Sequence, residues 1–380
     1  MYPFNKEKLQ ELMEQAQIDL LLASTRHNIR YLAGGYYYHF HARFTQMGRS
    51  QYLPFIGIPR GHFDDAFYVG LKGEERGEEL EVTEKKLWLN RYHYIEGRGT
   101  IPAAEKAAEA ITELDLNRAK IAIELPFLPA DAYETLKKHL SGASFVDATP
   151  LLDELRAIKT PEELDLIHSV ADRVSESIQA TFATGYDGVT TLEMANRVEQ
   201  EMTQRGLHFL WVFTCAGPSY LRAPSTQTWQ RGRILHIDSG GSVNDYLADL
   251  CRMGSLGEPS LLARDLHSAC LDVQSHVRNM LQPGVKGSEV YEAGQEALKR
   301  HPLGKYGVFV AHGIGMVSHE QPVINSQIHR SLEAGMVLSI ETEFRHPDIG
   351  HVKIEDAIAV TPHGNEGLGD LGREWQIIGK

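Results

Sequence analysis

The chain has 380 residues, of which 42% are hydrophobic and 23% charged, and its formal net charge at pH 7 is −13. This length exceeds one ordinary hydrophobic core and favours two domains of globular composition. The negative charge and the lack of a Lys/Arg cluster argue against a nucleic-acid partner or an anionic membrane surface, and no apolar run approaches the roughly 20 residues that span a bilayer.

The first 150 residues alternate between helical and strand-like patterns. Residues 5–17 are amphipathic and charged, which predicts a helix and not a signal peptide. The elements expected next are a buried strand at 18–24, a turn at 28–34, a strand at 50–59, the segment 85–94, a helix around 103–113, a strand at 120–125 and a helix at 129–140. Strands that alternate with helices predict an α/β domain, which we place at residues 1–155.

A helix start marks the boundary to a second domain, in KTPEELDLIHSVADRVSESIQ (159–179). Thr160 is a good N-cap, Pro161 suits the first helical position, and Glu163 completes a capping box. A further helix is predicted at 190–206. We assign residues 156–380 to a second α/β domain whose helices cover a strongly curved sheet.

The three cysteines, Cys215, Cys251 and Cys270, are widely spaced and form no CxxC pair. This pattern favours a reducing cytoplasm and gives no support to a thiolate zinc site or a disulfide framework. Cys251 lies in an apolar-flanked strand and is expected to be a small core residue.

Two acidic pairs are embedded in predicted hairpins of the second domain. In ILHIDSGGSVNDYLADLCRM (234–253), a fold near Val243 and Asn244 would set Asp238 opposite Asp249, about 5 Å apart. In GMVLSIETEFRHPDIGHVKIEDAIAVT (335–361), a fold at Asp348 would set Glu341 opposite Glu355.

Closely placed carboxylates repel one another, and the repulsion must be relieved by proton sharing, by basic neighbours or by cations. Four converging carboxylates would balance two divalent ions, and hard oxygen ligands with one imidazole indicate Mn, Fe, Co or Zn. The imidazole candidate is His312 in VFVAHGIGMVSHEQP (308–322), where Gly313 and Gly315 let backbone approach a crowded centre. A lone histidine beside a strand is more often structural, so the prediction depends on finding both hairpins and the histidine in one domain.

These motifs resemble the pita-bread metalloenzymes, a family that includes methionine aminopeptidase, aminopeptidase P, prolidase and creatinase. The family ligands occur in the order Asp, Asp, His, Glu, Glu, which here would be Asp238, Asp249, His312, Glu341 and Glu355. The resemblance extends over HIDSGG, ADLCRM, AHGIG, SIETEF and KIED, and LLDELRAIKTPEELDLI resembles the creatinase and prolidase branch. It implies an N-terminal creatinase-like α/β domain and a C-terminal pita-bread α/β domain with a curved antiparallel sheet.

The resemblance implies a dinuclear metal-dependent hydrolase that cleaves an amide C–N bond with a metal-bridging hydroxide. Asp249 and Glu355 would bridge two divalent ions, with manganese ahead of cobalt, iron and zinc. His319 would be the catalytic histidine that binds the tetrahedral intermediate and moves protons.

The substrate side of the site departs from the peptidase pattern. The peptidases carry a histidine four residues before the metal histidine, where this chain has Val308, and another in a segment that here reads TCAGPSYLRAPSTQT (214–228) and contains none. Arg222 and Arg345 are candidates to hold a substrate carboxylate, although each could equally be a surface arginine. His39, in the aromatic stretch 31–55, is a further substrate-binding candidate if the N-terminal domain overhangs the partner's site in a homodimer.

Three functional readings stay open. The leading one is an Xaa-Pro peptidase of the prolidase or aminopeptidase P type, acting on small peptides. The alternative is a hydrolase or lyase of a small carboxylate-bearing molecule, similar to creatinase, ectoine hydrolase or the dimethylsulfoniopropionate lyase of this fold. A binding module that has lost its chemistry is the third, and the retained ligand set argues against it.

Overall fold

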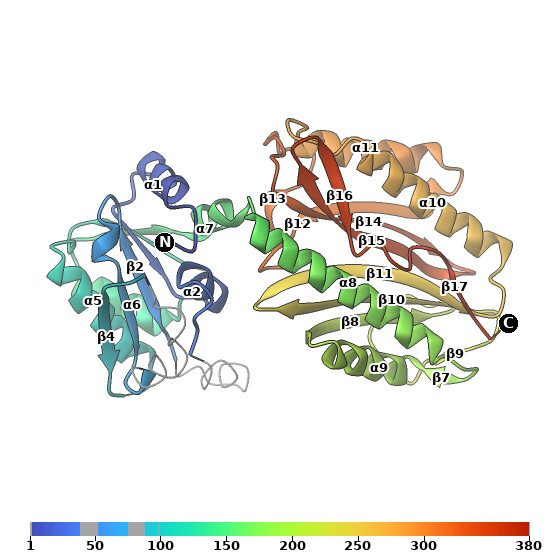
Figure 1. Ribbon diagram of the computed structural model, residues 1–380, viewed down its shortest axis with the longest axis horizontal. Coiled ribbons are helices and arrows are strands. Elements are labelled where there is room, and N and C mark those ends of the chain that lie inside the picture. The colour runs from blue at the N-terminus through green and yellow to red at the C-terminus, as the bar shows by residue number, and fades with distance from the viewer. Residues whose placement is uncertain (1, 39–51, 75–87, 98, 380) are drawn as a thin grey trace. The chain divides into compact units, whose positions relative to one another are not determined.

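The protein is described from a computed structural model, which defines residues 2–38, 52–74, 88–97 and 99–379. The chain divides into two compact units, Met1–Leu155 and Arg156–Lys380, and each has its own sheet (Figure 1). Among the described residues, no helix combines the length and the apolarity that crossing a bilayer requires.

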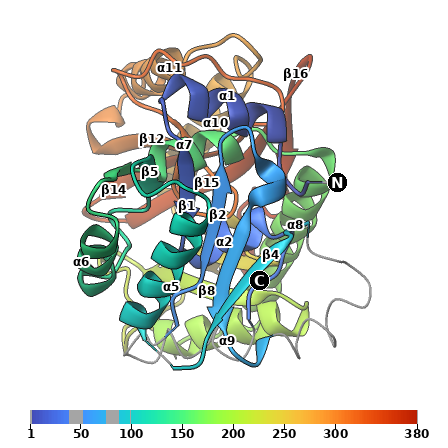
Figure 2. The ribbon, with the colours of Figure 1, turned by 90° about the vertical axis from the view of Figure 1, so that its left-hand side faces the viewer.

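The N-terminal unit is a mixed sheet with helices packed beside it (Figure 2). Its described strands form a six-stranded sheet in the order β4-β3-β2-β1-β5-β6, in which β1 pairs antiparallel with β2 and parallel with β5. The strands are β1 (Leu20–Ala23), β2 (Phe55–Pro59), β3 (Phe67–Leu71), β4 (Arg91–Ile95), β5 (Lys120–Ile123) and β6 (Ser144–Asp147). The helices are α1 (Lys6–Gln15), α2 (Arg26–Leu32), α5 (Thr100–Glu113), α6 (Ala130–His139) and α7 (Thr149–Arg156), with a 3₁₀ turn at Phe63–Asp65.

The predicted alternation of strands and helices in this unit is confirmed at α1, β1, β2, α5, β5 and α6. The turn predicted at 28–34 is wrong, because Arg26–Leu32 is the helix α2. Ile29 and Leu32 lie three residues apart and are both fully buried, so tertiary packing favours a helical turn that the short segment did not reveal. The strands β3 and β6 were not predicted.

The C-terminal unit is built around a larger, mainly antiparallel sheet. Within residues 156–379 this sheet has nine strands, with the order β13-β12-β14-β15-β11-β10-β8, while β16 pairs with β15 and β17 with β11. Its strands are β8 (His208–Ala216), β10 (Ile234–Val243), β11 (Tyr246–Leu256), β12 (Gly307–Gly313), β13 (Glu320–Val323), β14 (Val337–His346), β15 (Gly350–Thr361), β16 (Gly364–Leu368) and β17 (Gln376–Ile378). A small ladder joins β7 (Val189–Thr190) and β9 (Thr228–Trp229).

Two pairs of helices pack against this sheet and form two apolar clusters (Figure 1). The first pair is α8 (Pro161–Ala183) and α9 (Thr191–Gln204), and the second is α10 (Leu261–Arg278) and α11 (Gly287–Arg300); a 3₁₀ turn covers Gly304–Tyr306. Helix α8 contacts β10 and β11, and α10 contacts β14 and β15. Helix α11 contacts β12, so packed helices hold all five strands that carry the predicted ligands.

The helix start predicted at Thr160 is confirmed. The Thr160 backbone N–H donates to Glu163 Oε2 at 2.7 Å, and the Glu163 N–H donates to Thr160 Oγ1 at 3.3 Å. Pro161 occupies the first helical position, where it loses no helical hydrogen bond.

Candidate metal centre

Three of the four predicted acidic ligands lie in one row across neighbouring strands. Asp238 on β10 pairs with Cys251 on β11, Cys251 pairs with Glu355 on β15, and Glu355 pairs with Glu341 on β14. Because directly paired residues project from the same face of a sheet, these four side chains share one face. Asp249 joins the same face, two residues before Cys251.

The predicted opposition of Asp238 and Asp249 is wrong in register. Asp238 pairs with Cys251 and Asp249 pairs with Gly240, so the two acids are diagonal neighbours. The hairpin turns at Asn244 and Asp245, both at positive φ, +52° and +67°. A two-residue turn of this kind matches the strand twist, and it centres the hairpin one residue beyond the predicted position.

The second hairpin has the predicted register. Glu341 pairs directly with Glu355, and the ladder continues to the pair of His346 with Gly350 around Asp348.

Three of the predicted ligands converge most closely. Asp249, His312 and Glu355 each offer one ligand atom, and these atoms lie within 4.8 Å of one another; all three residues are buried. Glu341 adds an oxygen, since its Oε1 lies 3.9 Å from His312 Nε2. Asp238 belongs to a second group of potential ligands, with His236 and Cys251.

The atoms of this group fit a divalent ion. His312 Nδ1 lies 3.1 Å from the carbonyl oxygen of Gly313, which can only accept, so Nδ1 carries the hydrogen and Nε2 keeps its lone pair. Asp249 Oδ1 is buried without a hydrogen-bond partner among the described residues, an arrangement that costs free energy unless a cation completes it. Carboxylates with one imidazole suit Mn, Fe, Co or Zn.

A buried lysine lies among the acids. Lys353 Nζ is 2.7 Å from Asp238 Oδ2, 2.5 Å from Glu341 Oε2 and 2.7 Å from Glu355 Oε2. Arg222 also donates to Asp238 Oδ2. Basic neighbours therefore relieve part of the repulsion between Asp238, Glu341 and Glu355, and Asp238 is in contact with two of them.

Burial and mutual repulsion shift the titration of the acids. Burial raises the pKa of Glu355 to about 7 although Lys353 opposes the rise, and Glu341 and Asp238 add to it. The pKa of Asp249 is raised well above its usual range, first by burial and then by Glu355 and Asp238. Burial would lower the pKa of Lys353, but the charges of Glu355, Asp238 and Glu341 outweigh it and raise that pKa well above its ordinary value.

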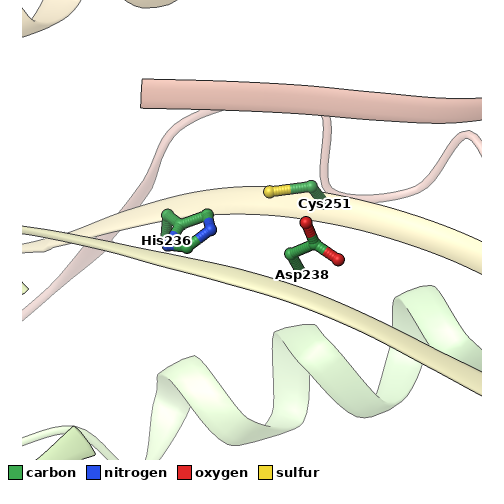
Figure 3. A group of neighbouring side chains, drawn as sticks. All are labelled: His236, Asp238 and Cys251. Atoms are coloured by element: carbon green, nitrogen blue, oxygen red, sulfur yellow. The ribbon is translucent and has the colours of Figure 1, made fainter. Parts of the chain in front are cut away.

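Two neutral side chains, those of His236 and Cys251, also lie beside Asp238 (Figure 3). Cys251 is fully buried, as predicted, and burial raises the pKa of its thiol well above the ordinary value. His236 is also fully buried, stacks on His351 with ring centroids 4.8 Å apart, and has no hydrogen-bond partner on either ring nitrogen among the described residues. Burial lowers the pKa of His236 well below its usual value, which keeps the ring neutral.

His319 lies next to the predicted metal histidine. Its exposed ring stacks on His312 with centroids 3.9 Å apart and planes 14° from parallel. Ser318 Oγ lies 3.2 Å from His319 Nδ1. Gly313 meets the expectation of a close backbone approach, because a Cβ there would clash with the Gln321 backbone.

The two candidate substrate-binding arginines line one pocket. Tyr220, Arg222, Arg345 and His351 surround a cavity of about 440 Å³. Each guanidinium also has an acidic partner, Asp238 for Arg222 and Glu343 for Arg345, where the separation is 2.5 Å. The third substrate-binding candidate, His39, lies outside the described residues.

Sequence reasoning missed several residues of the centre. Ser339 Oγ donates to Glu355 Oε1 at 2.8 Å, and the His351 ring pairs with Glu343. Lys353 precedes Glu355 by two residues, and that spacing in a strand places both side chains on one face, which was a usable signal. Ser339 and His236 likewise precede Glu341 and Asp238 by two residues on β14 and β10, so the same spacing was available for them. The contact of Ser339 with Glu355 depends in addition on the pairing of β14 with β15.

Fold and site together define a metal-dependent hydrolase. Comparison with known proteins agrees, since residues 165–362 match "Metallopeptidase family M24" and residues 6–158 match "Creatinase/Prolidase N-terminal domain". The chain belongs to metallopeptidase family M24.

Its relatives span nearly the same length. The Xaa-Pro dipeptidase of Pyrococcus horikoshii is 24% identical over 97% of both chains, and that of Pyrococcus furiosus is 26% identical over 74% of this chain and 83% of the relative. Among solved structures, the "Xaa-Pro dipeptidase from Bacillus anthracis" superposes with a TM-score of 0.83 at 22% identity, covering 98% of both chains. The expected fold class, a creatinase-like domain followed by an M24 domain with an antiparallel sheet, is confirmed.

Proposed function

We propose that the protein is a dinuclear metal-dependent hydrolase that cleaves the amide C–N bond of small Xaa-Pro peptides, as a prolidase or an aminopeptidase P. The observation that carries the proposal is the convergence of Asp249, His312 and Glu355, with Glu341 alongside, in a chain of family M24. Relatives named Xaa-Pro dipeptidase support the substrate class.

Two divalent ions, with manganese as the first candidate, would be held by Asp238, Asp249, His312, Glu341 and Glu355. When bound, such ions supply Lewis acidity toward the scissile carbonyl and activate water as the nucleophile. His319 has an exposed ring beside His312 and would exchange a proton with the substrate. Its Nδ1 faces Ser318, so Nε2 would be the nitrogen that takes part.

Arg222 and Arg345 would bind the carboxylate of the substrate. Both line the same cavity, so the two guanidinium groups together would orient a short peptide by its free C-terminal carboxylate. His39 stays a candidate for the same role. We further propose a homodimer in the cytoplasm, a compartment in which the three buried free cysteines would stay reduced.

One observation favours a second candidate, a hydrolase or lyase of a small carboxylate-bearing molecule. Arg222, from the segment that lacks the peptidase histidine, contacts Asp238 directly. Val308, at the other departure from the peptidase pattern, is 39% exposed on β12. A site that has arginine in place of histidine favours a substrate whose carboxylate lies close to the reacting bond, because a guanidinium binds a carboxylate through two hydrogen bonds.

The test is an assay of the manganese-loaded protein against Xaa-Pro dipeptides, longer Xaa-Pro peptides, creatine, ectoine and dimethylsulfoniopropionate. We expect proline release from dipeptides, and activity on longer peptides would instead indicate aminopeptidase P. The His312→Ala variant is the matched control and should release none. Turnover of a non-peptide compound with no peptide hydrolysis would replace the leading function by the second candidate.

A further inference from the structure

We propose that Lys353 is an internal cation that makes the two metal positions unequal: the first ion binds at Asp249, His312 and Glu355, and a second binds only by displacing the Lys353 ammonium from Asp238. The inference rests on the proposed metal dependence and deepens it. It concerns the order and strength of metal binding, and it holds whichever bond the enzyme cleaves.

The contacts of Lys353 are those of a cation in a ligand shell. Its ammonium lies 2.5–2.7 Å from oxygens of three different carboxylates, on Asp238, Glu341 and Glu355. The lysine side chain is 4% exposed, so water does not replace these contacts. Moving this ammonium away leaves buried carboxylates uncompensated unless another cation takes its place.

The distribution of positive charge is uneven across the acid cluster. Asp238 has two basic partners, Lys353 and Arg222, whereas Asp249 has no ion pair or hydrogen bond at its buried Oδ1 among the described residues. When all four carboxylates are ionised, the two basic side chains leave a net charge of −2, which one divalent ion balances. The unpartnered side of the cluster is also the side where His312 Nε2 keeps its lone pair.

An alternative partner for the lysine lies directly across the hairpin. Lys353 pairs with Glu343 in the β14–β15 ladder, so the two side chains project from the same face. The Glu343 carboxylate contacts His351 and Arg345, two of the residues that line the cavity. A lysine displaced from Asp238 could turn toward Glu343 and stay paired, because its flexible four-carbon stem allows such a change.

The experiment is equilibrium dialysis of the metal-free full chain against increasing manganese, with the bound metal counted by elemental analysis. Wild-type protein should bind one ion per chain first and a second at least about tenfold more weakly, since a divalent ion must compete with the ammonium. Lys353→Met should bind two ions with dissociation constants within about threefold of each other. Electron paramagnetic resonance should show spin-coupled manganese pairs at lower metal concentration in Lys353→Met than in wild type.

Lys159→Met is the matched control. Lys159 is another buried lysine of the same unit, paired with Glu320 at 2.9 Å and outside the acid cluster. This variant should retain the unequal binding of the wild type. Two equal sites in wild type, or an unchanged count in Lys353→Met, would overturn the inference.

A second variant keeps the test decisive if Lys353→Met does not fold. Asp238→Asn should retain the first ion with an affinity within about threefold of wild type and lose the second. Loss of all metal from Asp238→Asn would show that the positions are not separable and would overturn the inference. Failure to cleave any peptide would leave these metal counts unaffected, so it would contradict the proposed function alone.

Discussion

At the scale of single residues, the centre shows how buried charges are stabilised in pairs. Each carboxylate of the row has a nearby donor or cation, or offers an oxygen toward the position proposed for metal. Removing one partner of a buried group costs more than the interaction itself was worth, because the other group stays desolvated.

Ser339 tests this principle next to a proposed ligand. Its hydroxyl donates to Glu355 Oε1 at 2.8 Å and leaves Oε2 directed toward Lys353. We expect Ser339→Ala to weaken manganese binding about tenfold, because the carboxylate loses the group that orients it. A metal titration measures this change. The control is Ser177→Ala on α8, another buried serine, whose hydroxyl donates to Arg173 O at 2.7 Å; equal affinities in both variants would contradict the orienting role.

His267 gives a prediction for the dependence of stability on pH. It is 6% exposed and packs edge-on against Trp375 at 5.0 Å. Burial lowers its pKa to about 4, opposed by a hydrogen bond with the Arg373 backbone and assisted by the charges of Arg373 and Arg252. In the unfolded chain His267 therefore becomes protonated near pH 6.5, whereas in the folded chain it becomes protonated only near pH 4. The contribution of His267 to stability is complete above pH 6.5 and is lost as the pH falls toward 4, by an amount on the order of 3 kcal/mol.

The measurement is chemical denaturation of wild type and His267→Phe between pH 7 and 4. The free energy of unfolding should fall less steeply with decreasing pH in His267→Phe than in wild type. His276→Gln, an exposed position on the same helix, should follow the wild-type curve. Parallel curves for wild type and His267→Phe would contradict the prediction.

At the scale of elements, hairpin turns determine which acids meet. The turn at Asn244 and Asp245 sets the register that aligns Asp238 with Cys251, and the turn around Asp348 aligns Glu341 with Glu355. Shifting a hairpin by one residue would send its side chains to the opposite face of the sheet. Turn geometry thus contributes to the metal centre as directly as the ligands do.

Asn244 is the position at which to test this dependence. Its φ of +52° disfavours a β-branched residue, and the side chain is exposed, so a substitution acts through the backbone. Asn244→Val should lower the free energy of unfolding by about 1–2 kcal/mol, whereas Asn244→Gly should stay close to wild type. Denaturant titration distinguishes the two variants, and equal stability would show that the turn tolerates other conformations.

At the scale of the whole molecule, two units with separate sheets make up the chain, and the proposed ligands all belong to Arg156–Lys380. A ligand that binds one folded unit stabilises that unit by mass action. Metal should therefore affect the two units differently.

We expect manganese at about a hundredfold excess over its dissociation constant to raise the unfolding temperature of the C-terminal unit by roughly 5–10 °C. Scanning calorimetry gives the shift, and hydrogen exchange of peptides from β10–β15 compared with β1–β6 assigns it to a unit. In His312→Ala the shift should disappear. An equal gain of protection in both units would contradict a site confined to the C-terminal unit.

Much of the architecture followed from local patterns. The capping box at Thr160, the alternation of strands and helices before residue 150, and the pairing of Glu341 with Glu355 are short-range consequences of residue type and spacing. The boundary at 155 and the roles of the individual site residues stay predictions. The helix at Arg26–Leu32 was missed because seven residues carry too little periodicity to outweigh turn-prone neighbours.

The sequence by itself determined which chemistry the chain can perform, because residue types and short spacings specify strands, turns and ligand candidates. Only the tertiary structure decided how the acids are balanced. The Lys353 ammonium lies between three carboxylates because β10, β14 and β15, which are far apart in the sequence, belong to one sheet. The diagonal offset of Asp238 and Asp249 follows from the turn at Asn244 and Asp245, and the stacking of His319 on His312 follows from the path of the chain from β12 to β13. Strand pairing is a long-range property set by packing of the whole sheet, and short stretches of sequence do not contain it.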